Sequence, residues 1–208
     1  MLKTPDSANS MVLAFCNTIA RSATPIFLPI TRSVESKHGD CFHNVMRAVQ
    51  MRGGRIQYGW AIWEWTGTFF EAEHHAVHDP ENGPPWVDVT PGDPGEYRRL
   101  FLPDDKATYD FANSRTRHRN IRKAIGGDPL IEEFIAIAAE RETVLSEING
   151  LGKVVVVGDL AERVESVQSR FAEVFSRLAV KHSGPHDPCS CGSGRKFKHC
   201  HGARNRAE

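Results

Sequence analysis

Three cysteines and a histidine gather in one short stretch near the end of this 208-residue chain. The spacing is Cys189-x-Cys191, then eight residues, then Cys200-His201. Three thiolates and one imidazole satisfy the tetrahedral preference of Zn²⁺. So short a segment buries no core, so a bound metal supplies its folding free energy, on the order of 10 kcal/mol. Because four protein ligands fill the shell, we expect one structural zinc ion.

The remaining cysteines and the bulk composition limit the class of protein. Cys16 and Cys41 lie far apart, which predicts no disulfide framework in a chain of this length. No apolar run approaches the roughly 20 residues that a membrane-spanning helix needs. Lys plus Arg and Asp plus Glu number 26 each, so no strong global attraction to nucleic acid is indicated. We therefore expect a reduced, cytoplasmic protein with no membrane span.

Apolar periodicity and turn residues divide the chain into five regions of an α+β protein. An α+β domain with one helix and an antiparallel sheet is followed by a helical hairpin and the small zinc module. The predicted regions are a flexible lead-in (1–23), the α+β domain (24–103), a helical region (104–182), a linker (183–188) and the zinc module (189–204).

Within the α+β domain, the strongest local signal is a helix that begins at Cys41. Asp40 is a natural N-cap, and Gly53-Gly54 would end the helix. Strands are then expected from the β-branched and aromatic residues that follow. They are predicted at 56–65, 68–77 and 86–89, with an edge segment at 24–34 whose two prolines exclude a central strand.

A helical hairpin is predicted behind this domain. Asp128-Pro129 would open a helix of about 18 residues that ends near Gly150. Asp159 and Glu162 resemble a capping box for a second helix. Residues 154–157 read either as a short strand or as a buried connector. The second helix carries a seam of apolar residues spaced alternately by four and three positions, which should pack on the first helix: Leu160, Val164, Val167, Phe171, Val174 and Leu178.

A candidate catalytic site follows from the position of Cys41. A helix N-terminus favours thiolate over thiol, and its free N–H groups could hold an oxyanion. The alternative is a small buried apolar residue. His75 and Asp88 lie on predicted neighbouring strands, which can place them side by side. The sequence thus predicts Cys41 as nucleophile, His75 as base and Asp88 as the orienting carboxylate, with only one of His74 and His75 able to serve.

The run PCSCGSGRKFKHCHG at residues 188–202 resembles the SEC-C motif, named for the tail of the translocase ATPase SecA. The resemblance implies that Cys189, Cys191, Cys200 and His201 bind zinc. It also implies a surface that docks on a protein partner or the ribosome. The contact face it implies comprises Arg195, Lys196, Phe197 and Lys198.

Residues 38–92 resemble the transglutaminase-like branch of the papain-type cysteine hydrolases. The resemblance implies that Cys41, His75 and Asp88 form a triad that hydrolyses an amide or peptide-type substrate or transfers its acyl group. The segments that carry it are Asp40-Cys41-Phe42, Gly59-Trp60, His75-Ala76-Val77-His78 and Trp86-Val87-Asp88-Val89-Thr90-Pro91.

Two functions of different classes therefore remain open from the sequence. One is a cysteine hydrolase or acyl transferase that carries a zinc module. The other is a non-catalytic adaptor whose zinc module docks on a protein partner, a secretion component or the ribosome. The basic stretch at 115–123 lacks interleaved aromatic residues, so it is read as a solvated face and not as a nucleic-acid site.

Overall fold

The computed structural model describes residues 2–31, 35–81, 85–113, 117–148, 154–187, 189 and 193–204. The chain divides into two compact units. The sheet unit comprises Lys3–Glu64 and Phe70–Ile121, and the helical unit comprises Met1–Leu2, Trp65–Phe69 and Arg122–Glu208. Residues 104–121 thus belong with the sheet, whereas the sequence placed them in the helical region.

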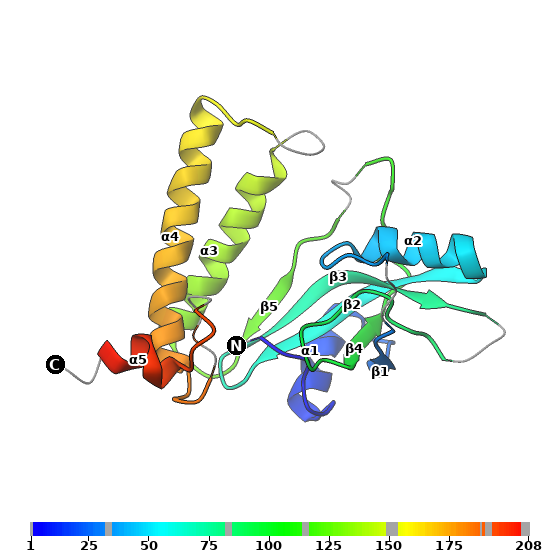
Figure 1. Ribbon diagram of the computed structural model, residues 1–208, viewed down its shortest axis with the longest axis horizontal. Helices are drawn as coiled ribbons and strands as arrows, with labels where there is room; N and C mark the ends of the chain where they lie inside the picture. Colours follow the sequence, from blue (N-terminus) through cyan, green and yellow to red (C-terminus); the bar gives the residue numbers. More distant parts are fainter. Residues whose placement is uncertain are drawn as a thin grey trace. The chain divides into compact units, whose positions relative to one another are not determined.

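The α+β class and the antiparallel sheet predicted from the sequence are confirmed. The sheet has five strands in the order β1-β4-β2-β3-β5. Figure 1 shows α1 and α2 on opposite sides of it. The elements are α1 (Ser10–Ile19), β1 (Ile26–Pro29), α2 (Cys41–Arg52), β2 (Arg55–Trp65), β3 (Phe69–Asp79), β4 (Arg98–Pro103) and β5 (Ile121–Ala124).

Helix α2 begins and ends where the sequence indicated. Gly53, with a φ of 74°, follows its last residue, a left-handed conformation that favours glycine. Asp40 occupies the N-cap position, but its side chain does not cap the first turn. Its carboxylate instead hydrogen-bonds the His43 ring at 2.7 Å. The N–H groups of the first turn, which begins at Cys41, therefore do not donate to the Asp40 side chain.

The expected flexible lead-in differs from the structure, which has helix α1 there. Asn9 caps this helix, since its side chain accepts hydrogen bonds from two first-turn N–H groups. Val12, Phe15 and Cys16 are buried at helical spacing. Phe15 stacks on Phe70 with ring centroids 5.6 Å apart. Burial of this apolar face fixes a segment that the sequence analysis treated as loose.

The predicted strand at 86–89 is reduced to two isolated bridges. Val87 pairs antiparallel with His78 of β3, and Asp88 pairs in parallel with Ile30, just after the edge strand β1. The segment therefore contacts the ends of two strands at once. Strand β4 was missed because Leu100, Phe101 and Leu102 are all fully buried, so the strand lacks the alternation of a half-exposed one.

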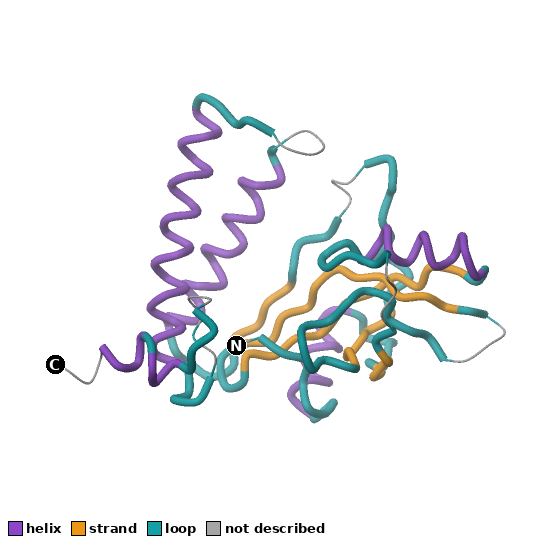
Figure 2. The backbone as a smooth tube through the Cα atoms, viewed as in Figure 1, coloured by secondary structure: helices purple, strands orange, loops and turns teal. Residues whose placement is uncertain are grey.

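The helical hairpin is confirmed as α3 (Pro129–Ser146) and α4 (Asp159–His182) (Figure 2). Asp128 caps α3, but Gly158 and not a capping box precedes α4. The apolar seam packs against α3, and residues 154–157 are loop. Three partly exposed ion pairs, spaced by seven residues along both segments, follow the antiparallel register: Glu133–Arg177, Glu140–Arg170 and Glu147–Arg163.

No helix among the described residues is both long and apolar enough to cross a membrane.

The hairpin core yields a stability prediction. Leu178 is fully buried between the two helices, so Leu178→Ala should lower the free energy of unfolding by about 2–5 kcal/mol. Chemical denaturation followed by circular dichroism measures this change. Glu173→Ala, at an exposed position of the same helix, should change it by less than about 0.5 kcal/mol. Equal effects of the two substitutions would contradict the packing described here.

Candidate functional site

The structure brings Cys41, His75 and Asp88 together inside the sheet unit. The Nε2 atom of His75 lies 2.9 Å from Oδ2 of Asp88, and the His75 ring also hydrogen-bonds the Cys41 side chain. Because Nε2 is taken by the carboxylate, Nδ1 is the nitrogen left for the sulfur. A cysteine, an imidazole and a carboxylate thus stand in one chain of hydrogen bonds, the arrangement that a catalytic triad requires.

Three different elements position these side chains. Cys41 is the first residue of α2, and His75 lies on β3. Asp88 comes from the bridge segment, where its N–H donates to the Pro29 carbonyl at 3.0 Å and its carbonyl accepts from Thr31 at 2.8 Å. The two bridges that replaced the predicted strand therefore hold the backbone of Asp88 in place.

The carboxylate of Asp88 is itself held at both oxygens. Oδ1 accepts a hydrogen bond from the Thr90 N–H at 2.8 Å. Oδ2 faces His75 and also Nη1 of Arg99, at 2.9 Å. Burial would raise the pKa of Asp88, but the charges of His75 and Arg99, with these hydrogen bonds, hold it below its ordinary value.

The charge state of His75 follows from its two neighbours, Asp88 and Cys41. Burial alone would lower its pKa, but the Asp88 carboxylate and the Cys41 sulfur raise that pKa to about 10. The ring is therefore a cation at neutral pH, between a carboxylate and a sulfur. An imidazolium beside a cysteine favours the thiolate, which is the nucleophilic form.

The neighbouring His74 has a different environment. Its Nδ1 accepts a hydrogen bond from the His118 N–H at 2.9 Å, so Nε2 carries the proton and donates to the Ala107 carbonyl at 2.7 Å. Burial lowers the pKa of His74 to about 4. His74 is thus a neutral structural residue, and the geometry places His75, not His74, beside Asp88.

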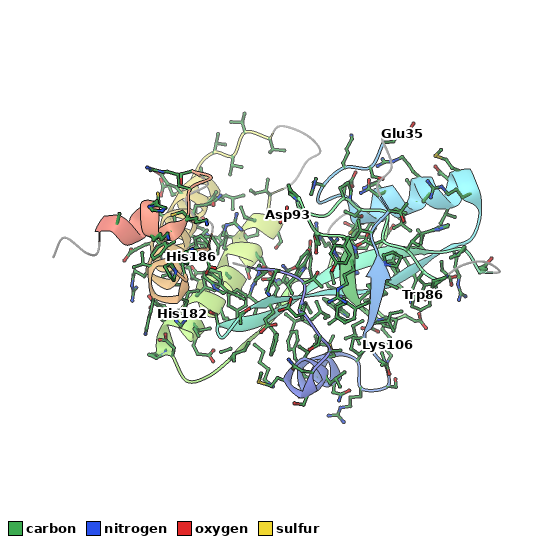
Figure 3. All side chains as sticks on the ribbon, turned by 60° about the horizontal axis from the view of Figure 1, so that its bottom comes forward. Glu35, Trp86, Asp93, Lys106, His182 and His186 are labelled. Atoms are coloured by element: carbon green, nitrogen blue, oxygen red, sulfur yellow. The ribbon has the colours of Figure 1, made fainter. Side chains whose placement is uncertain are left out.

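A cavity of about 140 Å³ opens beside the sulfur. Cys41 and His75 line it, together with Trp63, Glu73 and Asp93. Figure 3 labels Asp93, on the loop that precedes β4. The cavity reaches Cys41, a residue that is itself only 3% exposed.

Arg99 and Glu96, which both line this cavity, were missed in the sequence analysis. Arg99, which lines the cavity, binds Asp88 and also Glu96, with Nη2 3.1 Å from Oε2 of Glu96. The sequence does hold a signal for Arg99. It is a charged residue that directly precedes the apolar run at 100–102, which is expected in the core of the α+β domain.

The C-terminal segment contains η2 (Phe197–His199) and α5 (His201–Arg204). The Cys189 N–H donates to the Arg195 carbonyl at 2.8 Å. Ser193 Oγ and Arg195 Nη2 lie 3.5 and 3.6 Å from the sulfur of Cys200. Cysteine sulfur is a ligand that zinc prefers. The described ligand candidates therefore fit the metal predicted from the sequence.

The other two predicted ligands fall where the structure gives no side-chain description. Cys191 lies outside the described residues, and so does the side chain of His201. In the described part of the chain, no group of three or more histidine, cysteine or acidic residues forms a metal cluster. The four-ligand zinc site therefore stays a prediction.

The implied contact face needs one correction. Arg195 and Lys196 are exposed, but Phe197 is buried. A Cβ atom on Gly202 would lie 2.8 Å from the Phe197 ring, so the glycine lets α5 close over it. The Phe197 N–H also donates to the Asp187 carbonyl at 2.7 Å. Phe197 is thus the small core of this segment and not part of its surface.

Comparison with known proteins identifies the C-terminal segment. Residues 187–203 match the SEC-C motif. The protein translocase subunit SecA of Polaromonas sp. is 44% identical over 48 residues, 23% of this chain and 5% of that protein. SecA of Burkholderia pseudomallei is 51% identical over 43 residues, 16% of this chain and 4% of that protein. The motif predicted from the sequence is therefore confirmed.

The similarity covers only a small part of either protein. The chain spans about 5% of the length of the curated relative from Polaromonas. No solved structure matches the chain. The resemblance of residues 38–92 to papain-type hydrolases therefore stays a prediction.

Proposed function

We propose that the sheet unit is a cysteine-dependent hydrolase or acyl transferase that acts on an amide or ester carbonyl, as a peptide-type substrate offers. The observation that carries the proposal is the buried hydrogen-bonded chain from Cys41 through His75 to Asp88, with Cys41 and His75 lining one cavity. The resemblance to the transglutaminase-like branch of the papain fold supports the same assignment.

The proposed reaction runs in two steps. The Cys41 thiolate attacks the substrate carbonyl carbon, while N–H groups of the first turn of α2 stabilise the oxyanion. His75 then gives its proton to the leaving amine or alcohol, and an acyl-enzyme remains. Water, or an acceptor amine, attacks this thioester and loses a proton to His75. The thiolate and imidazolium are restored, and Asp88 keeps the ring oriented throughout.

Local packing supports the residues quoted for the papain-type resemblance. A Cβ on Gly59 would lie 2.2 Å from the Leu102 carbonyl oxygen, so the glycine of the Gly59-Trp60 pair allows β2 and β4 to approach. Val77 is fully buried in a cluster with Leu28 and Phe101. The valine at a position where the family usually has tryptophan thus lies in the core, packed on the same Phe101 ring that His75 contacts.

The proposal predicts that one cysteine reacts selectively. Iodoacetamide at about pH 6 should alkylate Cys41 well before Cys16, because only a thiolate reacts at that pH. Cys16 is a matched internal control, since it is fully buried and burial raises the pKa of its thiol to about 11. Site-resolved mass spectrometry measures both rates. If Cys41 is as inert as Cys16 in the folded chain, the proposed activity is excluded.

The SEC-C match favours a second function for the other end of the chain. We propose that residues 187–203 bind one structural zinc ion and dock the protein on a partner of the secretion machinery or on the ribosome. The matched curated proteins are translocase subunits, and Arg195 and Lys196 expose positive charge for such a contact. A cytoplasmic location, where free thiols persist, is part of this proposal.

Docking is testable separately from catalysis. Pull-down with purified SecA-interacting factors or ribosomes should retain the parent chain and a Cys41→Ser variant equally. Reversing the charge of Arg195 and Lys196 together should weaken retention. Loss of retention in Cys41→Ser, or none in the charge-reversed chain, would contradict the adaptor role of the tail.

A further inference from the structure

The most unusual group near the candidate site is the guanidinium of Arg99. Its side chain is only 5% exposed, although arginine is almost never buried this deeply unless it is paired. Nη1 and Nη2 bind Asp88 and Glu96 at 2.9 and 3.1 Å. Among the described residues, its buried Nε has no hydrogen-bond partner. Such a costly position calls for a specific role.

The contacts of Arg99 lead directly into the triad. Nη1 of Arg99 and Nε2 of His75 share a single carboxylate oxygen, Oδ2 of Asp88. The guanidinium also lies over the ring of Trp63, 4.8 Å from its centroid, a cation–π arrangement that fixes its orientation. Arg99 is therefore placed to hold the carboxylate that orients His75.

A second contact extends this network to the cavity wall. Oε2 of Glu96 accepts from Arg99 and also from the Asp93 N–H, at 3.2 Å. Oε1 accepts from Thr4 at 2.8 Å. A Cβ on Gly92 would lie 2.5 Å from Oε2 of Glu96, so the loop folds closely around this carboxylate. One Arg99–Glu96 pair thus joins the triad to the loop that lines the cavity.

We propose that Arg99 is a positioning residue of the candidate active site, which acts through Asp88 to keep that carboxylate ionised and aimed at His75. This inference rests on the proposed function. Arg99 touches neither the sulfur nor the reacting carbon, so its effect must reach Cys41 through three contacts in series: Arg99–Asp88, Asp88–His75 and His75–Cys41. Without the guanidinium, Asp88 would take up a proton at higher pH, and His75 would lose the charge that holds its own proton.

The charged groups around Asp88 determine the expected pH effect. His75 on β3 and Arg99 on β4 face it directly, while Cys41 on α2 and Glu96 before β4 face those two cations. Glu73 on β3, also at the cavity, is paired with Arg117. Removing a cation and removing an anion from this set should therefore move the protonation of Asp88 in opposite directions.

The test is the pH profile of Cys41 alkylation in three variants. Arg99→Met should move the acid limb of the profile to higher pH and lower the rate at about pH 5 roughly tenfold. Arg99→Lys keeps the charge and should restore most of that limb. Glu96→Gln removes a neighbouring anion, so its acid limb should stay in place or move to lower pH.

A purely structural role would give a different pattern. If the substitutions only destabilised the fold, the alkylation rate of Cys41 would fall in Arg99→Met and Glu96→Gln alike, and the size of the fall would not depend on pH. Acid limbs that move together, or an Arg99→Met profile equal to that of the parent, would overturn the inference. If Arg99→Met does not fold, Arg99→Lys and Glu96→Gln still test the inference, since an acid limb that moves to higher pH in Glu96→Gln as much as in Arg99→Lys would overturn it. An inert Cys41 in the parent chain would instead refute the proposed function itself.

Discussion

Replacing His75 by alanine should reduce the alkylation rate of Cys41 at about pH 6 by roughly two orders of magnitude. The ring is a cation because Asp88 and Cys41 raise its pKa to about 10 despite burial. A group with a raised pKa keeps its proton until the pH passes that value. The parent rate should therefore stay nearly constant from about pH 6 to pH 9 and change only as the imidazolium is lost near pH 10.

The variant should instead behave as an ordinary thiol, with a rate that rises about tenfold per pH unit below about pH 8. His78→Gln is the matched control, because His78 lies on the same strand but hydrogen-bonds the Gly53 carbonyl, not the triad. Its profile should follow that of the parent. Equal losses in both variants would mean that strand β3, and not the imidazolium, controls the sulfur.

Removing the metal from the C-terminal segment should abolish its structure while leaving the hairpin folded. The described core of the segment consists of two buried side chains, Cys189 and Phe197, which are too few to hold it. Zinc therefore has to supply the stability, on the order of 10 kcal/mol for such modules. Metal analysis should find one zinc per chain, and Cys200→Ser should lose it and open residues 187–203 to proteolysis.

Ser176→Ala, at an exposed position of α4, is a control that should keep both the zinc and the protease resistance. Thermal unfolding of the hairpin should be nearly unchanged in Cys200→Ser, because its core lies between α3 and α4. A chain that retains no zinc, yet resists protease across residues 187–203, would contradict the predicted role of the metal.

The elements that sequence reasoning located best carry their own boundary signals. Gly53 ends α2, and Asp128 caps α3. Glycine readily adopts the positive φ that ends a helix, and an aspartate side chain accepts hydrogen bonds from first-turn N–H groups, so both signals are local. The apolar seam of α4 was equally visible in the sequence, since its residues recur with the period of a helix that buries one face against a neighbour. Local interactions of this kind need no knowledge of the rest of the fold.

The elements that were missed depend on distant parts of the chain. Strand β4 has no alternation, because both of its faces are covered, and helix α1 gains its order from Phe70. Asp88 was expected on a full strand, but its segment is held by two isolated bridges, to Ile30 and to His78. Register and bridge pairing are tertiary, so a single sequence does not carry them.

The candidate site shows the same division. Cys41 could be placed because a helix start is a local feature, and His75 and Asp88 could be matched to it by chain order. The pairing of Arg99 with Asp88 and Glu96 could not be found, because it joins a strand that the sequence did not reveal.

Nitrogen-15 NMR of histidine-labelled protein tests the ion pair at the centre of this account most directly. The prediction is that both ring nitrogens of His75 carry protons at neutral pH, and that Asp88→Asn or Cys41→Ser lowers the pH at which one proton leaves. His74, whose pKa burial lowers to about 4, should appear neutral in the same spectrum. A neutral His75 ring at pH 7 in the folded chain would contradict the proposed thiolate–imidazolium site.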